Sequence, residues 1–286
     1  MPVKYSVKDT KTGRELVLES AWDDSIAEYM ARNHITNLQV NYAKGFIGDD
    51  VRFLPKLPFL EGLHMIFYHI KDISPIHDLV NLRRLGLGCP VKTVVDFTCF
   101  PHIEGCSIMR SVKTKGLSTA YSLKSLGLNP YSQKDLSELS GLVNLESLSI
   151  SQSRLTSLEG LENLTKLTKL GIHMLSYLIS LHGIESLAQL EELDVVTCKK
   201  INSIEEVHSL TSLRLLAIDN CGEIGSLHPV VGLNKLEKVF FTESTNILDG
   251  DLSPLASLPH LKRVAFMDRK HYSHRCTPEL DGVVAK

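Results

Sequence analysis

One short pattern, LxxLxL, recurs along this chain and constrains its fold more than any other feature. It stands as ITNLQV at residue 35, LRRLGL at 82, LESLSI at 145, LEELDV at 190 and LKRVAF at 261, and eleven copies follow one another at intervals of 20 to 25 residues. A register held this long indicates stacked copies of one structural unit. Each unit offers a short strand whose apolar face it cannot bury alone, so neighbouring units must cover one another.

A second apolar series lies between the strand motifs, as in ISPIHDLVNL (73–82) and LTSLEGLENLTKL (155–167). With both series, the sequence resembles the leucine-rich repeat (LRR) family, and its spacing is similar to the short 22–23-residue bacterial repeat of internalin-like proteins. The resemblance covers residues 35–267. It implies an α/β solenoid with a curved parallel β-sheet on the concave face and short 3₁₀ or helical turns on the convex face. It also implies a recognition scaffold rather than an enzyme.

The ends of the chain lie outside the repeats. Residues 1–34 predict a cap, because the exposed end of a solenoid needs covering; a separate partner-binding helix is the alternative. YSVKDTKTGRELVLE alternates around Thr12-Gly13 like a β-hairpin. SAWDDSIAEYMARN reads as a helix, with Ser20 and Asp23 similar to a capping box and one apolar face made of Trp22, Ile26, Tyr29 and Met30. Residues 268–286 are interpreted as a C-terminal tail without enough periodicity for another unit.

Cys198 follows a group of acidic residues in LEELDVVTCKKI and has two interpretations. In the LRR family its offset carries a buried residue that bonds the backbone of the adjoining turn, and we prefer this interpretation. The alternative is a reactive thiol, which would need an electropositive site; the adjacent Lys199 and Lys200 keep it open. The same offset holds Ser111, Ser153, Cys221 and Ser244. The irregular spacing of all six cysteines predicts free thiols in a reducing cytoplasm.

Composition and motifs narrow the function classes. The 286 residues carry a formal net charge of −2, which provides no basic field for nucleic acid or an anionic membrane. No apolar run is long enough for a signal peptide core or a membrane span, so we expect a cytoplasmic protein. His271, His274 and Cys276 could supply three metal ligands, but we interpret them as part of a solvated basic tail. We expect no catalytic residues, no metal and no cofactor.

The concave face is the predicted binding surface. Strand alternation turns the residues between the inner leucines toward this face. In its C-terminal half an acidic group (Glu192, Asp194 and Asp219) lies near apolar residues (Leu215, Phe240 and Met267), with basic residues (Lys169, His173, Lys238 and Arg263) at the border. An aromatic anchor surrounded by charge is typical of protein interfaces. The plainer interpretation is a solvated face with a few incidental apolar residues.

These observations favour a non-catalytic scaffold that binds another protein on its concave surface. An intracellular inhibitor or immunity protein is the preferred specific hypothesis. The alternatives are a secreted bacterial effector that binds a host protein and, from another class, an enzyme with its site in the cap or the tail.

Overall fold

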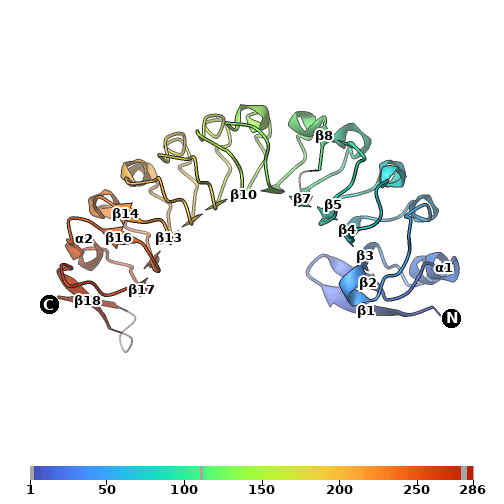
Figure 1. Ribbon diagram of the computed structural model, residues 1–286, viewed down its shortest axis with the longest axis horizontal. Helices are drawn as coiled ribbons and strands as arrows, with labels where there is room; N and C mark the ends of the chain where they lie inside the picture. Colours follow the sequence, from blue (N-terminus) through green and yellow to red (C-terminus); the bar gives the residue numbers. More distant parts are fainter. Residues whose placement is uncertain (1–2, 110–111, 278–281, 286) are drawn as a thin grey trace. The chain divides into compact units, whose positions relative to one another are not determined.

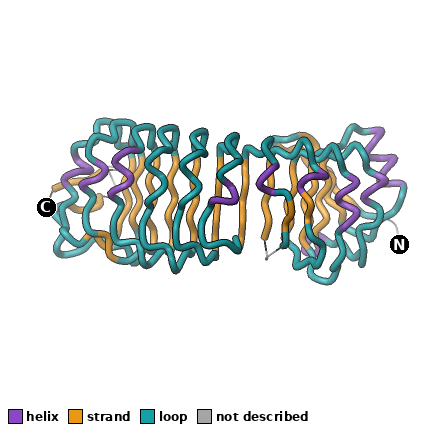
Figure 2. The backbone as a smooth tube through the Cα atoms, turned by 90° about the horizontal axis from the view of Figure 1, so that it is seen from above, coloured by secondary structure: helices purple, strands orange, loops and turns teal. Residues whose placement is uncertain are grey.

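The computed structural model describes residues 3–109, 112–277 and 282–285, and the chain divides into two compact units, Met1–Asn129 and Pro130–Lys286. Within each unit the strands lie side by side along the concave side, while most of the helical turns lie on the convex side (Figures 1 and 2). All eleven predicted motifs form strands of these sheets. The predicted solenoid is therefore confirmed, and none of the helices in the described ranges is long and apolar enough to cross a membrane.

The sheet of the first unit begins with an antiparallel hairpin and continues as parallel strands. Its order is β1 (Tyr5–Thr10), β2 (Gly13–Leu18), β3 (Asn37–Asn41), β4 (Gly62–Ile66), β5 (Arg84–Leu87), β7 (Gly105–Met109) and β9 (Ser125–Asn129). The connections contain the 3₁₀ helices η1 (Tyr42–Lys44), η2 (Leu54–Lys56), η3 (Ser74–Asp78), η4 (Phe97–Cys99) and η5 (Leu117–Thr119). They also contain a small parallel pair, β6 (Val95–Asp96) with β8 (Thr114–Lys115).

The sheet of the second unit is parallel throughout. Its order is β10 (Ser147–Ser151), β11 (Lys169–His173), β12 (Glu192–Val196), β13 (Leu215–Asp219), β15 (Lys238–Phe241) and β17 (Arg263–Phe266). The connections contain η6 (Ser137–Leu139), η7 (Glu205–Ser209), η8 (His228–Val230), α2 (Ser253–Ala256) and the pair β14 (Glu223–Ile224) with β16 (Asn246–Ile247). β18 (His274–Thr277) and β19 (Gly282–Ala285) form a closing antiparallel pair.

Burial alternates along most of the repeat strands as the leucine pattern requires, although β3 is buried throughout. In β10, Leu148 and Ile150 are at most 2% exposed, whereas Ser147, Ser149 and Ser151 are half-buried on the opposite face. Fully burying a leucine or isoleucine side chain stabilises the fold by about 1.5–3 kcal/mol. The repeat thus creates a continuous apolar interior and leaves the concave face free for side chains of any kind.

The N-terminal segment covers the first repeat as a hairpin and a helix. β2 pairs in parallel with β3, which places Leu16 beside Leu38 in the interior. The helix α1 (Ser25–Arg32) buries Ile26 and Met30. The chain therefore extends the sheet at this end by two strands before the repeats begin.

The predicted helix start and capping box are wrong. The helix begins at Ser25, and the side chain of its N-cap residue, Asp24, accepts from Trp22 and Lys56 rather than capping the helix. The hydroxyl of Ser20 instead forms hydrogen bonds with the backbone of Lys4, the residue before β1. Asp23 accepts a hydrogen bond from the Ser25 N–H at 2.9 Å. Trp22 precedes the helix and stacks on Phe53 with ring centroids 4.2 Å apart. Tertiary contacts with the hairpin and the first repeat decide where this helix starts.

The C-terminal segment has more structure than the tail interpretation gave it. Tyr272 is 2% exposed and packs edge-on against Phe241 and Phe266. The backbone N–H of Ile247 donates a hydrogen bond to the Tyr272 hydroxyl at 2.9 Å. The strands β18 and β19 lie against β17, so this segment closes the second unit.

The buried polar column predicted from Cys198 is present in the second unit. The Cys198 thiol donates weakly to the Ile172 carbonyl at 3.6 Å, and the Cys221 thiol to the Val195 carbonyl at 3.4 Å. Burial raises the pKa of the Cys198 thiol to about 12, which keeps it protonated and disfavours the reactive-thiol alternative.

One residue predicted for the buried polar column is not part of it. Ser244 was predicted to belong to it, but Thr245 does so instead: its hydroxyl donates to the Ile218 carbonyl at 2.6 Å and accepts from the Cys221 N–H at 3.0 Å. Ser244 is exposed. The repeat is longer here, and the extra residue shifts the register by one. Ser111 lies outside the described residues.

Candidate functional site

The predicted binding surface lies on the concave face of the second unit. The register aligns Lys169, Glu192, Leu215, Lys238 and Arg263 as one column across successive strands. Asp194 and Phe240 lie two positions further along their strands, and His173 and Asp219 lie four positions further. The structure therefore brings these residues onto one face. Their exposure, however, is uneven, and several have partners within the face.

Two of the three predicted acidic residues are paired with the neighbouring strand. Glu192 accepts from the Lys169 ammonium at 2.7 Å, and Asp194 lies 3.2 Å from His173 Nε2. Their side chains keep nearly half of their exposure, 44% for Glu192 and 46% for Asp194. Exposed pairs of this kind contribute about 0–1 kcal/mol to stability. A binding partner can therefore replace them with its own contacts at a small cost in free energy.

Asp219 has a structural role that the sequence did not indicate. Its Oδ1 accepts hydrogen bonds from the Thr242 N–H at 2.7 Å and from the Thr242 hydroxyl at 2.6 Å. The carboxylate therefore joins the end of β13 to the loop after β15. Removing it would disturb the fold locally as well as any partner contact.

Phe240 is half-buried rather than fully exposed. The register sets it between Ala217 and Ala265, whose side chains are small. The guanidinium of Arg263 lies 5.8 Å from the ring centroid, within the range of a cation–π contact. Leu215 is half-buried as well, and Met267 beyond β17 is 54% exposed. These side chains form a partly apolar region, which we call the Phe240 surface, together with Lys238.

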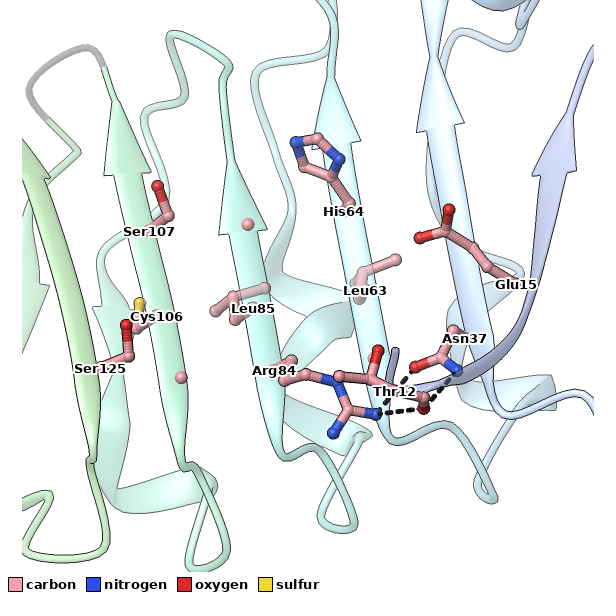
Figure 3. Close-up of a pocket in the computed structure, with 13 residues that line it drawn as sticks. Thr12, Glu15, Asn37, Leu63, His64, Arg84, Leu85, Cys106, Ser107 and Ser125 are labelled. Atoms are coloured by element: carbon pink, nitrogen blue, oxygen red, sulfur yellow. Dashed lines mark hydrogen bonds between the residues drawn. The ribbon is translucent and has the colours of Figure 1, made fainter. Parts of the chain in front are cut away.

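A second feature of the concave face lies entirely in the first unit and was missed by the sequence reasoning. It is a hollow of about 340 Å³ lined by residues of the hairpin and of five repeat strands. Figure 3 shows Arg84 beside Asn37 and Thr12 near one end of the strands, with His64 nearer the other end. Ser107 and Ser125 lie across the sheet from them. We call this region the Arg84 hollow.

Glycines at concave positions create the Arg84 hollow. Asn37 is paired with Gly62 in the register, and a Cβ on Gly62 would lie 2.2 Å from the Asn37 Oδ1. Likewise, a Cβ on Gly86 would lie 2.6 Å from His64 Cδ2. Each larger side chain thus leans over a glycine of the next strand. Glycine beside a large polar residue in the same concave column was a signal available in the sequence.

The polar groups of the hollow are fixed by contacts with the hairpin. The Asn37 side chain is 3% exposed and donates to the backbone carbonyls of Thr12 and Arg14 at 3.3 and 3.0 Å. Its Oδ1 accepts from the Arg84 guanidinium at 2.9 Å. Glu15 pairs with Lys8 at 2.7 Å. Partial burial lowers the pKa of His64, so its imidazole is neutral at neutral pH.

The tail histidines are engaged in the closing segment. His271 Nε2 lies 2.9 Å from the Ile247 carbonyl, and His274 Nδ1 lies 2.8 Å from the Ser273 hydroxyl. The side chain of Cys276 is outside the described part of the structure. Among the residues that are described, no group of three or more His, Cys, Asp or Glu side chains is arranged to hold a metal ion.

Comparison with known proteins gives a fold. Neither the protein-family models nor the curated proteins gave a match. Among solved structures, an internalin from Listeria monocytogenes aligns with a TM-score of 0.67 at 21% identity, over 88% of this chain and 75% of the internalin. The chain has an internalin-like leucine-rich repeat fold.

Two further leucine-rich repeat structures support that assignment. The functional domain of InlJ from Listeria monocytogenes, described as including a cysteine ladder, aligns with a TM-score of 0.54 at 18% identity, over 87% of this chain and 62% of InlJ. A plant peptide hormone receptor, solved in complex with RGF2, aligns with a TM-score of 0.50 at 18% identity, over 91% of this chain and 40% of the receptor. The leucine-rich repeat strands thus provide the concave surfaces described above.

Proposed function

We propose that this chain is a non-catalytic scaffold that binds another protein, and that the Phe240 surface is its principal contact. The observation that carries the proposal is a half-buried aromatic ring on a sheet face, aligned with alanines on both neighbouring strands and with a guanidinium 5.8 Å from its centroid. Phenylalanine and arginine in this arrangement are typical of the central part of an interface.

The charges around the Phe240 surface suggest the chemistry of the partner. Glu192 and Asp194 keep nearly half of their exposure, although each is paired. A partner that is basic at the matching position would replace the pairs with Lys169 and His173. Such peripheral charges act mainly on the association rate and on its dependence on salt.

As a finer part of the proposal, the chain acts in the cytoplasm and neutralises a toxic protein or an enzyme. The plant receptor among its structural neighbours was solved in complex with RGF2, which supports the use of this fold for binding. A secreted effector remains the competing function. Detection of the native protein in the culture medium, with a cytoplasmic marker absent from the medium, would favour the effector over the inhibitor.

Comparative affinity capture tests the Phe240 surface. Wild type, Phe240→Ala and Val231→Ala are used in parallel as baits, and captured proteins are identified by mass spectrometry. Val231 is a suitable control because it is an exposed apolar residue, 47% exposed, in the turn after η8. Truncating a central interface aromatic typically costs about 2 kcal/mol or more in binding free energy.

A partner retained by wild type and Val231→Ala but lost or rapidly released by Phe240→Ala would support the proposal. Equal dissociation rates for all three baits would remove the Phe240 surface as the contact. Circular dichroism of each bait checks that loss of binding does not reflect loss of fold.

A further inference from the structure

We propose that the Arg84 hollow is a second recognition site, which holds an acidic side chain of an extended peptide segment with Arg84 as the anion contact. The site lies wholly in the first unit. It therefore does not depend on the Phe240 surface, and either assignment can fail without the other.

Arg84 is oriented by neutral groups. Its Nη2 donates to the Asn37 amide oxygen at 2.9 Å and to the Thr12 carbonyl at 3.5 Å, and the nearest paired carboxylate, Glu61, is 4.0 Å away. The adjacent Arg83, by contrast, makes a 2.5 Å contact with Glu104. The positive charge of Arg84 is thus held mainly by neutral groups, and its carboxylate partner, Glu61, lies at the outer limit of an ion pair. This is the arrangement that an incoming anion can complete.

The remaining donors of Arg84 point to the same conclusion. Within the described part of the chain, its Nε and Nη1 groups make no hydrogen bond, while the side chain keeps 31% exposure. Guanidinium N–H groups form strong charge-assisted hydrogen bonds with carboxylates, and a fixed guanidinium loses less freedom when it does so. Arg84 is therefore prepared for a carboxylate approaching from the concave side.

The rest of the hollow carries polar groups that an extended peptide can use. Leu63, Leu85 and Cys106 also line it but are buried in the core. The neutral imidazole of His64 offers one donor and one acceptor, and its ring makes no hydrogen bond within the described ranges. Ser107 and Ser125 add hydroxyls. Such groups can satisfy the backbone N–H and C=O groups of an extended segment.

The floor and the volume set the size of the ligand. Gly105 presents its backbone to the hollow, since, in the described part of the chain, only Arg84 Cγ, at 3.7 Å, lies within 4 Å of its Cβ position; this permits the close approach of another main chain. The volume of about 340 Å³ lies at the lower end of the range of ligand pockets. It suits one side chain with its flanking peptide groups.

NMR titration of the full chain tests the assignment. The probe is the pentapeptide Ac-Gly-Ser-Glu-Ser-Gly-NH2, and its matched control carries Gln in place of Glu. We monitor the Arg84 Nε–Hε signal and the backbone amides of Gly86, Gly105 and Ser107. We expect saturable shifts of these signals with the Glu peptide and an affinity at least about tenfold lower with the Gln peptide, because only the former makes charge-assisted hydrogen bonds.

Variants identify the anion contact. Arg84→Gln should reduce the affinity for the Glu peptide by about tenfold or more, whereas Arg83→Gln should leave it unchanged, because Arg83 is already paired. An unchanged amide spectrum in the second unit confirms that each variant is folded. Should Arg84→Gln also alter the fold, saturable binding of the Glu peptide to wild type and its loss on replacing Glu with Gln still decide the question.

Three results would overturn the assignment. The first is equal affinity for the Glu and Gln peptides, and the second is unchanged affinity in folded Arg84→Gln. The third is saturation by sodium acetate at the same affinity as the Glu peptide, which would show a general anion site without peptide recognition. Absence of saturable binding up to the solubility limit of the peptide likewise counts against it.

Discussion

Gly160 provides a sharp test of how tightly neighbouring repeats of the second unit are packed. It has φ +105°, and a Cβ at this position would lie 2.3 Å from the carbonyl carbon of Leu136 and 2.5 Å from the backbone N of Ser137. These are backbone atoms of the preceding turn, so no side-chain rotation can relieve the clash. Gly160→Ala must either separate two repeats or distort the turn.

The loss of stability expected for Gly160→Ala is the sum of a backbone strain cost and a packing cost. A non-glycine residue at such a φ costs about 1–3 kcal/mol, and overpacking against backbone that cannot rotate away adds about 1–3 kcal/mol. Gly232 isolates the first term, because it has φ +87° but nothing within 4 Å of its Cβ position. Gly183, one repeat after Gly160, is intermediate, since its Cβ would lie 2.9 Å from the Leu158 carbonyl oxygen.

We therefore expect Gly160→Ala to be destabilised by about 2 kcal/mol more than Gly232→Ala, with Gly183→Ala between them. For a chain of this length that difference corresponds to a melting midpoint lower by about 3 °C. Thermal unfolding followed by circular dichroism measures the three midpoints. Equal midpoints for Gly160→Ala and Gly232→Ala would show that the repeats can separate freely at this turn.

Three further predictions concern the thiols, a histidine and the N-terminal segment. Without reductant, a thiol reagent should label all six cysteines of the denatured chain, but the buried thiols of Cys198 and Cys221 should react slowly in the native protein; a stable disulfide would refute the free-thiol prediction. The lowered pKa of His64 means that the unfolded chain binds its proton first, so stability should fall as the pH drops below about 6.5; urea midpoints of His64→Asn should depend less on pH in that range, and an unchanged dependence would contradict this reasoning. Deleting residues 1–34 should expose the edge of β3 and cause aggregation, whereas a monomeric truncated chain with the wild-type melting midpoint would argue against the cap.

The period of the leucines made the repeat strands predictable. A residue two positions from an inner leucine must also point inward, and a one-residue slip would turn every leucine outward. The same rule predicted that Phe240 and Glu192 share the concave face, as the structure confirms. Their role in binding is a separate question, which the capture experiment addresses.

The wrong predictions concern residues whose bonding partner the leucine period does not specify. Ser244 was placed one residue away from the buried column because the loop after β15 is longer. Asp219 was read as a steering charge, yet its partner is Thr242 in the next repeat. The capping box failed because Ser20 bonds to Lys4 instead. In each case the bonding partner depends on loop length and side-chain geometry, which the leucine period does not give.

The two concave regions also use charge differently, and the register explains why. In the second unit Lys169 faces Glu192 directly on the next strand, so the two side chains neutralise each other. In the first unit Gly62 lies between Asn37 and Arg84 in the same column. Because this glycine has no side chain, the guanidinium reaches across it to an amide oxygen. A single glycine thus leaves Arg84 oriented but without a close anion, whereas a carboxylate at the same position would have closed the hollow from within.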